Sequence, residues 1–515
     1  MQATPAQQSR RPRRWLGRGL LTLACVYLLL MIPEGAPPAP KGAGKQSFAW
    51  QRDAFWSALE NEFLQARGKE PALQTAVFHQ TLARNWQFLS VLAATNLPPS
   101  APLFDQLETN FFLLAPKAAA CGPRIPLGVF LHTYAELRRQ VKRQSEHWPM
   151  DSPETRARLY RSLYGARAAL EETLLQVPRE RFPAVVLGDD EPSATPSATV
   201  RDVTIHSGDI LVSRGGAATS ALIARGNDFP GNFSHVALVH VDEATKQASV
   251  IESHIESGVA VSPVEKYLTD TKLRILVLRL RADLPQLAAD PLLPRKAAAL
   301  AVSNALARHI PYDFTMDYRD HTRIFCSEVA SAAYQPFGVT LWMGLSHLST
   351  PGVTSWLAAL GARHFETQEP SDLEYDPQLR VVAEWRDAET LFKDHMDNAV
   401  IDVMLEAAER GEKLGCNPWQ LPGARLAKAW SIALNRFGKA GPIPEGMSAA
   451  TALRVQRLKA NHAALAARLR EKAEKFTAER GYVPPYWELV RLAREAATDC
   501  SRVFRRVPPP RASRQ

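Results

Sequence analysis

The sequence lacks the short motifs that mark structural zinc sites and zinc proteases. It has only five cysteines in 515 residues, and neither a CxxC nor an HExxH pattern occurs. Zinc sites of these kinds need paired ligands at such spacings. We therefore expect no bound metal and no other cofactor.

Basic residues interleaved with aromatic residues are also missing. The net charge is +9, but much of the excess lies near the two ends of the chain, from Arg10 to Arg18 and from Arg502 to Arg514. A nucleic-acid-binding protein usually carries its positive charge as a patch or stripe on one folded face. We therefore expect no nucleic-acid partner.

The chain has no apolar run of the usual membrane-spanning length. The stretch from Leu16 to Ile32 has 17 residues, whereas a spanning helix needs about 20. The stretch follows a cluster of arginines, and Glu34 and Pro37 make Ala36 a poor cleavage site for a signal peptidase. We interpret residues 1–45 as an uncleaved amino-terminal membrane anchor and linker. The positive-inside rule then places the body in a bacterial periplasm, held at the inner membrane.

Along the rest of the sequence, the predicted secondary structure changes twice. Residues 46–187 and 388–507 carry apolar residues at helical spacing, which predicts two α-helical domains. Between them, after a polar linker at 188–202, residues 203–387 contain β-branched runs that predict several strands and two helices. Strands that precede and flank the helices favour an α+β fold. The basic, proline-rich end at 508–515 is expected to be disordered.

One cysteine precedes a helix of small residues. Cys326 is followed by Ser327 and Glu328, and apolar residues then recur at helical spacing up to Tyr334. A thiol at a helix amino terminus lies near the positive end of the helix dipole, which favours the thiolate, and near N–H groups that can hold an oxyanion. Taken alone, the pattern is more often that of a buried, inert cysteine.

A histidine upstream supplies a base for that thiol. His235 begins an apolar strand, and a second strand carries Glu252. If the turn between them is the four-residue segment 242–245, His235 lies directly opposite Glu252, close enough for the carboxylate to orient the imidazole. A six-residue turn would instead bring His254 opposite His235, so His254 is the alternative orienting residue.

Five short motifs in this region together resemble a known family. Residues 203–385 are similar to the permuted papain-like cysteine hydrolases of the NlpC superfamily, of the YiiX/YaeF type, in which histidine precedes cysteine. The motifs are Gly208-Asp-Ile-Leu, Ser234-His235-Val-Ala-Leu-Val, Val250-Ile-Glu252, Pro311-Tyr312-Asp313-Phe314 and Phe325-Cys326-Ser-Glu328-Val.

The resemblance implies a fold and a set of roles. A thiol helix packs against a small antiparallel sheet. Cys326 is the nucleophile, His235 the base and Glu252 the polar third member, while Tyr312 lines the site or helps to hold the oxyanion. Asp313 and Glu328 are expected to hold loops and the helix start. The two long helical flanks and the segment from Trp342 to Gly361 depart from the family's pattern, and we expect them to cover the cleft.

The substrate stays open between two chemistries. An envelope location favours an amide or peptide bond, as in peptidoglycan. The alternative is a lipid acyl hydrolase or acyltransferase that forms a thioester on Cys326. A different class of function is an inactive papain-like scaffold whose helical flanks bind a protein partner. The intact set of cysteine, histidine and glutamate favours an enzyme.

Overall fold

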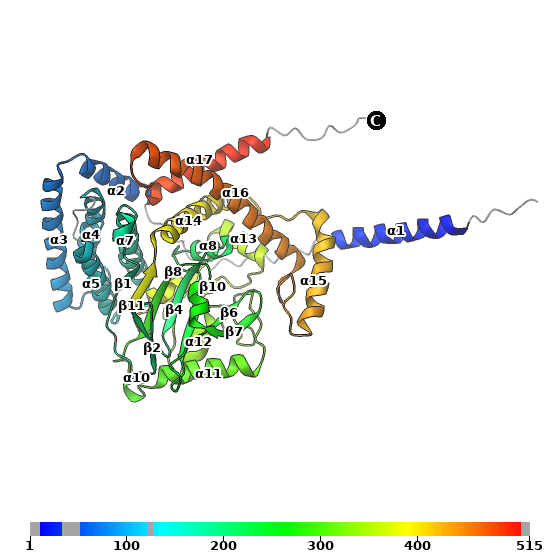
Figure 1. Ribbon diagram of the computed structural model, residues 1–515, viewed down its shortest axis with the longest axis horizontal. Helices are drawn as coiled ribbons and strands as arrows, with labels where there is room; N and C mark the ends of the chain where they lie inside the picture. Colours follow the sequence, from blue (N-terminus) through cyan, green and yellow to red (C-terminus); the bar gives the residue numbers. More distant parts are fainter. Residues whose placement is uncertain (1–10, 33–51, 122–126, 506–515) are drawn as a thin grey trace, which may run out of the picture.

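A computed structural model of the chain describes residues 11–32, 52–121 and 127–505. The expected linker at 33–44 and the expected tail at 508–515 lie outside the described residues. Figure 1 shows a central sheet, helices on both sides of it, and one helix that projects from the body. The expected α+β class, with helical regions that flank the sheet domain, is confirmed.

The sheet has seven strands, all antiparallel to their neighbours, in the order β1-β11-β8-β4-β5-β6-β7. Most residues of its middle strands are buried, because one core cluster covers each face. The strands are β1 (Val185–Leu187), β4 (Ile210–Gly215), β5 (His235–Val241), β6 (Ala248–His254), β7 (Gly258–Pro263), β8 (Lys272–Leu280) and β11 (Leu379–Arg386). Two short pairs lie apart from it: β2 (Ser197–Val200) with β3 (Val203–His206), and β9 (Ser346–His347) with β10 (Glu366–Thr367).

The Gly-Asp pair before β4 has a structural explanation. Gly208 has a φ of +96°, and a Cβ atom there would lie 2.3 Å from Pro294. Only glycine fits this backbone and this close approach. The next residue, Asp209, accepts two hydrogen bonds of 2.8 Å from the guanidinium of Arg279 on β8. The motif therefore fastens the start of β4 to its neighbouring strand.

Helices within residues 203–387 cover the sheet. The thiol helix α12 packs on β5 and β6, and α11 packs on β5, β6 and β7. Their bounds, with those of the smaller helices, are α8 (Ala218–Arg225), α9 (Val264–Thr269), α10 (Pro285–Ala289), α11 (Leu293–Ala307), α12 (Glu328–Tyr334) and α13 (Pro351–Leu360).

The amino- and carboxyl-terminal helices share one hydrophobic core rather than two. Figure 1 shows α14, in yellow, running between the amino-terminal helices and α16. The helices are α2 (Arg52–Arg67), α3 (Pro71–Ala94), α4 (Pro102–Cys121), α5 (Leu127–Ser145), α6 (Pro153–Leu159) and α7 (Gly165–Leu174), then α14 (Ala388–Glu409), α15 (Leu421–Asn435), α16 (Ala449–Arg480) and α17 (Tyr486–Arg505). The boundaries predicted near 188 and 388 thus separate segments that pack together.

Buried ion pairs tie the amino-terminal helices to the sheet domain. Arg167 on α7 pairs with Glu374, and both side chains are 1% exposed. A second pair joins Arg274 on β8 to Glu171 on α7. Removing one partner of such a pair is costly, because the other charge then stays buried alone. The helical flank and the sheet domain are therefore one mechanical unit.

The expected membrane anchor coincides with α1 (Arg11–Met31), which projects away from the body in Figure 1. Among the described residues, no helix combines the length and the apolar character needed to cross a bilayer. The prediction of a membrane-spanning anchor is therefore not supported.

Candidate active site

The thiol of Cys326 lies at the end of a segment that is fastened on both sides. The side-chain oxygen of Ser253 on β6 donates to the Ile324 carbonyl over 2.6 Å, and the Ile324 amide donates to Pro311 over 3.1 Å. Glu328 accepts from the Phe325 amide over 2.9 Å. This last bond confirms that Glu328 holds the helix start.

The sulfur lies beside the strand that carries His235. Its nearest polar partner is the carbonyl oxygen of Ser234, at 3.7 Å. The backbone N–H groups of Val236 and Ser327 also face the sulfur. Cys326 is thus held against the backbone on both sides of the histidine.

The thiol is not activated in this structure. Burial, followed by the carboxyl of Glu369, raises the pKa of Cys326 to about 12, and the N–H groups around the sulfur only partly oppose this. The prediction that the start of the helix favours the thiolate is therefore wrong. Cys326 is 4% exposed, and in so dry an environment the cost of desolvating a thiolate exceeds what a short helix contributes.

His235 and Glu252 form a close pair. The Nε2 atom of His235 lies 2.7 Å from Oε2 of Glu252. The other carboxylate oxygen lies 3.3 Å from Nε2 of His254. The imidazole ring of His254 stacks on that of His235 with 6.0 Å between the ring centres. The phenol ring of Tyr267 stacks on His235 at 6.4 Å. The imidazole is therefore oriented by one carboxylate and contacts two other rings.

Of the two registers considered, the one that places His235 directly opposite Glu252 does not form, although the predicted pair does. Val241 lies opposite Ala248 and Ala237 opposite Glu252, so the turn is the six-residue alternative. Lys246 has a φ of +58° and donates its amide to Asp242 over 2.9 Å, so it belongs to the turn. Glu252 reaches His235 as a diagonal neighbour, a separation that a long side chain can bridge.

The electrostatics of this group follow from burial and hydrogen bonding. Burial lowers the pKa of His235, and the hydrogen bond to Glu252 offsets only part of that effect. Burial would raise the pKa of Glu252, but the hydrogen bonds to His235 and His254 outweigh it and hold that pKa well below its ordinary value. The hydrogen bond to Glu252 raises the pKa of His254. Near pH 7 the site thus holds a carboxylate beside a neutral His235.

Tyr312 lies on the loop before the thiol helix. Burial, followed by the proximity of Cys326 and Asp313, raises the pKa of its hydroxyl well above the ordinary value. The phenol is therefore a hydrogen-bond donor at any working pH. Asp313 accepts from the Thr315 amide over 2.9 Å and from the Asp317 amide over 2.8 Å, so its predicted loop-holding role is confirmed.

Sequence reasoning missed another carboxyl group near the thiol, that of Glu369. Glu369 is 4% exposed, and burial, followed by Asp372, raises its pKa well above the ordinary value. Its backbone carbonyl accepts from the Trp342 indole over 2.8 Å. The preceding Gln368 hydrogen-bonds Ser331 on the thiol helix over 2.8 Å. No motif marks this glutamate, because only the folded chain brings its segment to the thiol.

Elsewhere, the described part of the chain has a cavity but no metal-binding cluster. Within it, no three His, Cys, Asp or Glu side chains come together in a way that could hold a metal ion. A cavity of about 390 Å³ lies at the far end of α12 from the thiol, between Asp209, Arg279, Pro294 and Tyr334. Its charged groups are paired with each other, so it has no visible part in the thiol chemistry.

A thiol before a helix, packed on an antiparallel sheet whose histidine precedes the cysteine in the chain, is the arrangement that the resemblance to permuted papain-like hydrolases predicts. Residues 204–383 match the model of a family described as permuted papain-like amidases, YaeF/YiiX, C92 family. The match supports a cysteine hydrolase of the amidase class in general terms.

Comparison with individual proteins adds little. A similar solved structure is that of the metalloprotein YiiX from Escherichia coli O157:H7. It is 21% identical with a TM-score of 0.28, and the match covers 35% of this chain and 97% of that one. No curated protein sequence matches.

Proposed function

We propose that the chain is a cysteine amidase in which Cys326 is the nucleophile, His235 the general base and Glu252 the residue that orients the base. The observation that carries this proposal is the 2.7 Å contact between His235 Nε2 and Glu252, made where the strand backbone also holds the sulfur. Because Glu252 occupies Nε2, Nδ1 is the nitrogen left to take the thiol proton.

The reaction begins from a neutral pair. The buried thiol has a raised pKa and the imidazole a lowered one, so the proton moves from Cys326 to His235 as the sulfur attacks the carbonyl carbon. N–H groups near the sulfur and the Tyr312 hydroxyl stabilise the resulting oxyanion. His235 then gives the proton to the leaving amine, and a water molecule activated by His235 releases the acid and restores the thiol.

The substrate we propose is an amide bond of the bacterial cell envelope, as in the peptide part of peptidoglycan, with the enzyme body in the periplasm. The family supplies the amide chemistry. The compartment rests on the arginine-rich start of the chain followed by an apolar stretch, which is the pattern of an export signal or anchor.

Acyl transfer from a lipid ester is the second proposal. It uses the same thioester on Cys326. The observation that favours it is the exposed apolar face of α15, which suits a lipid substrate. The segment after that helix lies against the site loop, because a Cβ atom at Gly446 would lie 3.2 Å from Phe314.

The test is hydrolysis of amide and ester substrate panels by Cys326→Ala. The matched control is Cys416→Ala, which removes a partly exposed thiol far from His235 in the sequence. We expect the first variant to lose turnover while it keeps the wild-type melting temperature, and the second to keep both. Turnover by Cys326→Ala at the wild-type rate would refute the assignment.

A further inference from the structure

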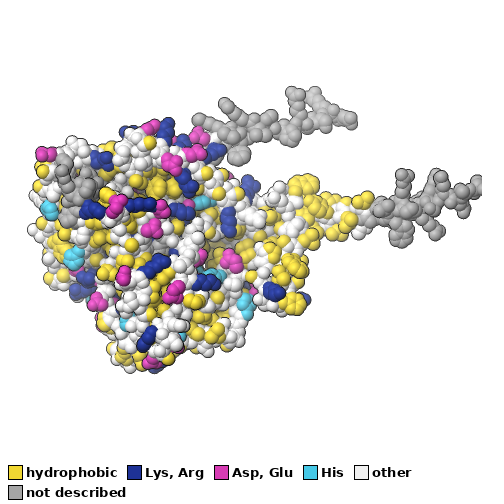
Figure 2. All heavy atoms as spheres, in the orientation of Figure 1, with side chains coloured by type: hydrophobic (Ala, Val, Ile, Leu, Met, Phe, Trp, Pro, Cys, Tyr) yellow, Lys and Arg dark blue, Asp and Glu magenta, His cyan; other side chains and the backbone are white. Residues whose placement is uncertain are grey.

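The large exposed hydrophobic side chains are concentrated in two segments. Among the described residues, 21 such side chains are exposed, and 13 of them lie within residues 20–32 or 419–437. The others are scattered singly, which is normal for a soluble surface. Figure 2 shows the two clusters as yellow side chains where α1 leaves the body. The two segments therefore differ from the rest of the described surface.

The exposed residues of the second segment form a single stripe. Trp419, Leu426, Trp430 and Phe437 follow one another at steps of seven, four and seven residues, which places them on one face of α15 and its short extensions. All four are more than 60% exposed. The face that packs on the body instead carries Leu421, Pro422 and Ser431. The helix thus presents its largest apolar side chains to the outside.

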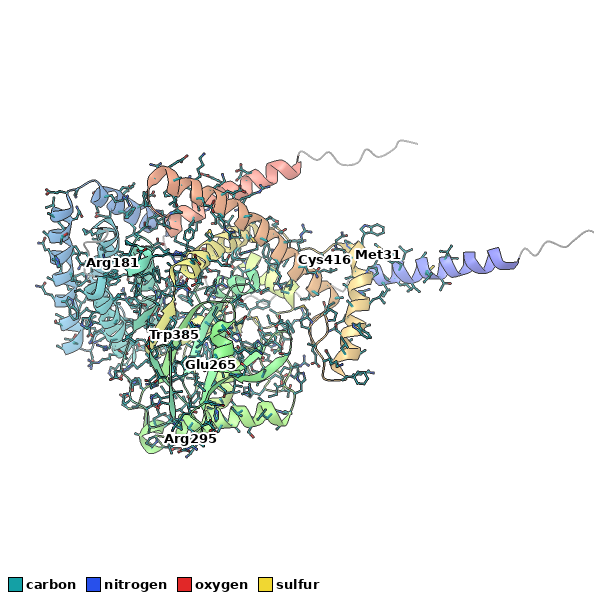
Figure 3. The ribbon with its side chains drawn as sticks, viewed as in Figure 1. Met31, Arg181, Glu265, Arg295, Trp385 and Cys416 are labelled. Atoms are coloured by element: carbon teal, nitrogen blue, oxygen red, sulfur yellow. The ribbon has the colours of Figure 1, made fainter. Side chains whose placement is uncertain are left out.

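The two apolar segments are joined by hydrogen bonds. The guanidinium of Arg425 on α15 donates to the carbonyls of Leu30 and Ile32, at 2.9 and 2.8 Å. The hydroxyl of Tyr27 donates to the Trp419 carbonyl over 3.0 Å. Figure 3 labels Met31 and Cys416 at this junction. The end of α1 and the start of α15 therefore lie side by side, which brings the two apolar segments to the same part of the molecule.

The charged residues of the segment that contains α15 are all basic. From Lys413 to Pro444 the sequence contains five basic residues and no aspartate or glutamate. Arg436 and Lys439 are exposed next to Phe437. Tryptophans with basic residues beside an apolar face are typical of helices that lie in the headgroup region of a bilayer.

We propose that the outer face of α15, together with residues 20–32, is a docking surface for anionic phospholipid bilayers. In this position α15 lies flat in the interface, with Trp430 and Phe437 inserted and Arg436 and Lys439 at the phosphates. No helix needs to span the membrane. The proposal does not depend on the thiol chemistry.

Docking would also place the active site at the membrane. The Lys428 ammonium donates to the Pro444 carbonyl over 2.8 Å, and the Glu445 carboxylate bonds His309 over 2.8 Å. The following Gly446 lies against Phe314 on the loop that carries Tyr312. The chain that leaves the docking surface thus continues directly onto the site loop.

The test is hydrogen–deuterium exchange of the full chain with vesicles. The vesicles are equal parts phosphatidylglycerol and phosphatidylcholine, or phosphatidylcholine alone. We expect peptides from 419–437 to gain protection with the anionic vesicles, less with the neutral ones, and less in 1 M salt. Because exchange is read peptide by peptide, binding through residues 20–32 alone is distinguished.

The decisive variant is Trp430→Glu with Phe437→Glu, and its matched control is Leu306→Glu with Leu73→Glu, two exposed leucines outside the surface. We expect the first to bind anionic vesicles at least about tenfold more weakly, and the second to bind like wild type. Equal loss in both, no protection of 419–437, or protection that grows with protein concentration without vesicles would each overturn the proposal. The last result would indicate a second copy of the chain as the occupant.

Discussion

One carboxylate, that of Glu252, bridges two histidines: it lies 2.7 Å from Nε2 of His235 and 3.3 Å from Nε2 of His254. The strand register places Glu252 between the two, opposite Ala237. His235 is the histidine whose own strand backbone touches the thiol sulfur. His254 shares the carboxylate and is more open to solvent.

Replacing Glu252 should impair catalysis much more than replacing His254. We expect Glu252→Gln to lower kcat/KM on an amide substrate by at least tenfold, because a positioned base contributes about 10²–10⁴-fold. His254→Ala should lower it by less than about threefold, because His235 keeps its hydrogen bond. Larger loss in His254→Ala than in Glu252→Gln would reverse the two roles.

The pH profile separates orientation from simple structural damage. His235 must be neutral to accept a proton, and burial holds its pKa below 6.5, so kcat/KM should rise with pH through a value below 6.5. Removing the Glu252 carboxylate lowers the pKa of His235 further. The acid limb should therefore move to lower pH in Glu252→Gln. An unmoved limb would mean that a different group titrates.

The resting thiol should react slowly. An ordinary cysteine has a pKa of about 8.5, whereas burial raises that of Cys326 to about 12. We expect iodoacetamide to label the Cys326 peptide more slowly than the Cys416 peptide at pH 8, with a rate that still rises at pH 10. Fast labelling that levels off below pH 8 would show a preformed thiolate instead.

The buried pair between α7 and the sheet domain should be essential for folding. Arg167→Met leaves the Glu374 carboxylate buried without its cation, which we expect to cost about 3–5 kcal/mol in urea unfolding. Arg179→Met is the matched control, because Arg179 pairs with Glu389 at an exposed position and should leave the unfolding midpoint unchanged. A loss below about 1 kcal/mol in Arg167→Met would show that the flank is dispensable.

A buried glutamate should make stability depend on pH. Burial raises the pKa of Glu172 to about 7 from an ordinary 4.5. The folded chain therefore holds this proton where the unfolded chain releases it, and stability falls as the pH rises from about 4.5 to about 7. Glu172→Gln still accepts from the Tyr486 amide, a 2.9 Å bond in the wild type. We expect it to gain about 1–3 kcal/mol over wild type at pH 8 and little at pH 5; an equal gain at both would contradict this.

The sequence predicted the α+β class, most strands and the meeting of Cys326, His235 and Glu252, because strand patterns and motif order are local signals. It left the register open between two turn lengths, since nothing in the letters shows that Lys246 adopts a left-handed backbone. It failed on the thiol, because the burial that raises the pKa of Cys326 comes from distant segments. Glu369 and the buried arginines were invisible for the same reason.

The most direct test of the account is intact-mass analysis of the full chain mixed rapidly with an activated amide or ester substrate. We expect one acyl group on the wild-type protein, mapped to the Cys326 peptide. In His235→Ala the same acyl group should form much more slowly. Cys326→Ser should carry no thioester. Acylation of the wild-type protein at another residue would contradict the proposed thiol mechanism. Turnover by the wild type without any adduct, together with full activity of Cys326→Ser, would contradict it as well.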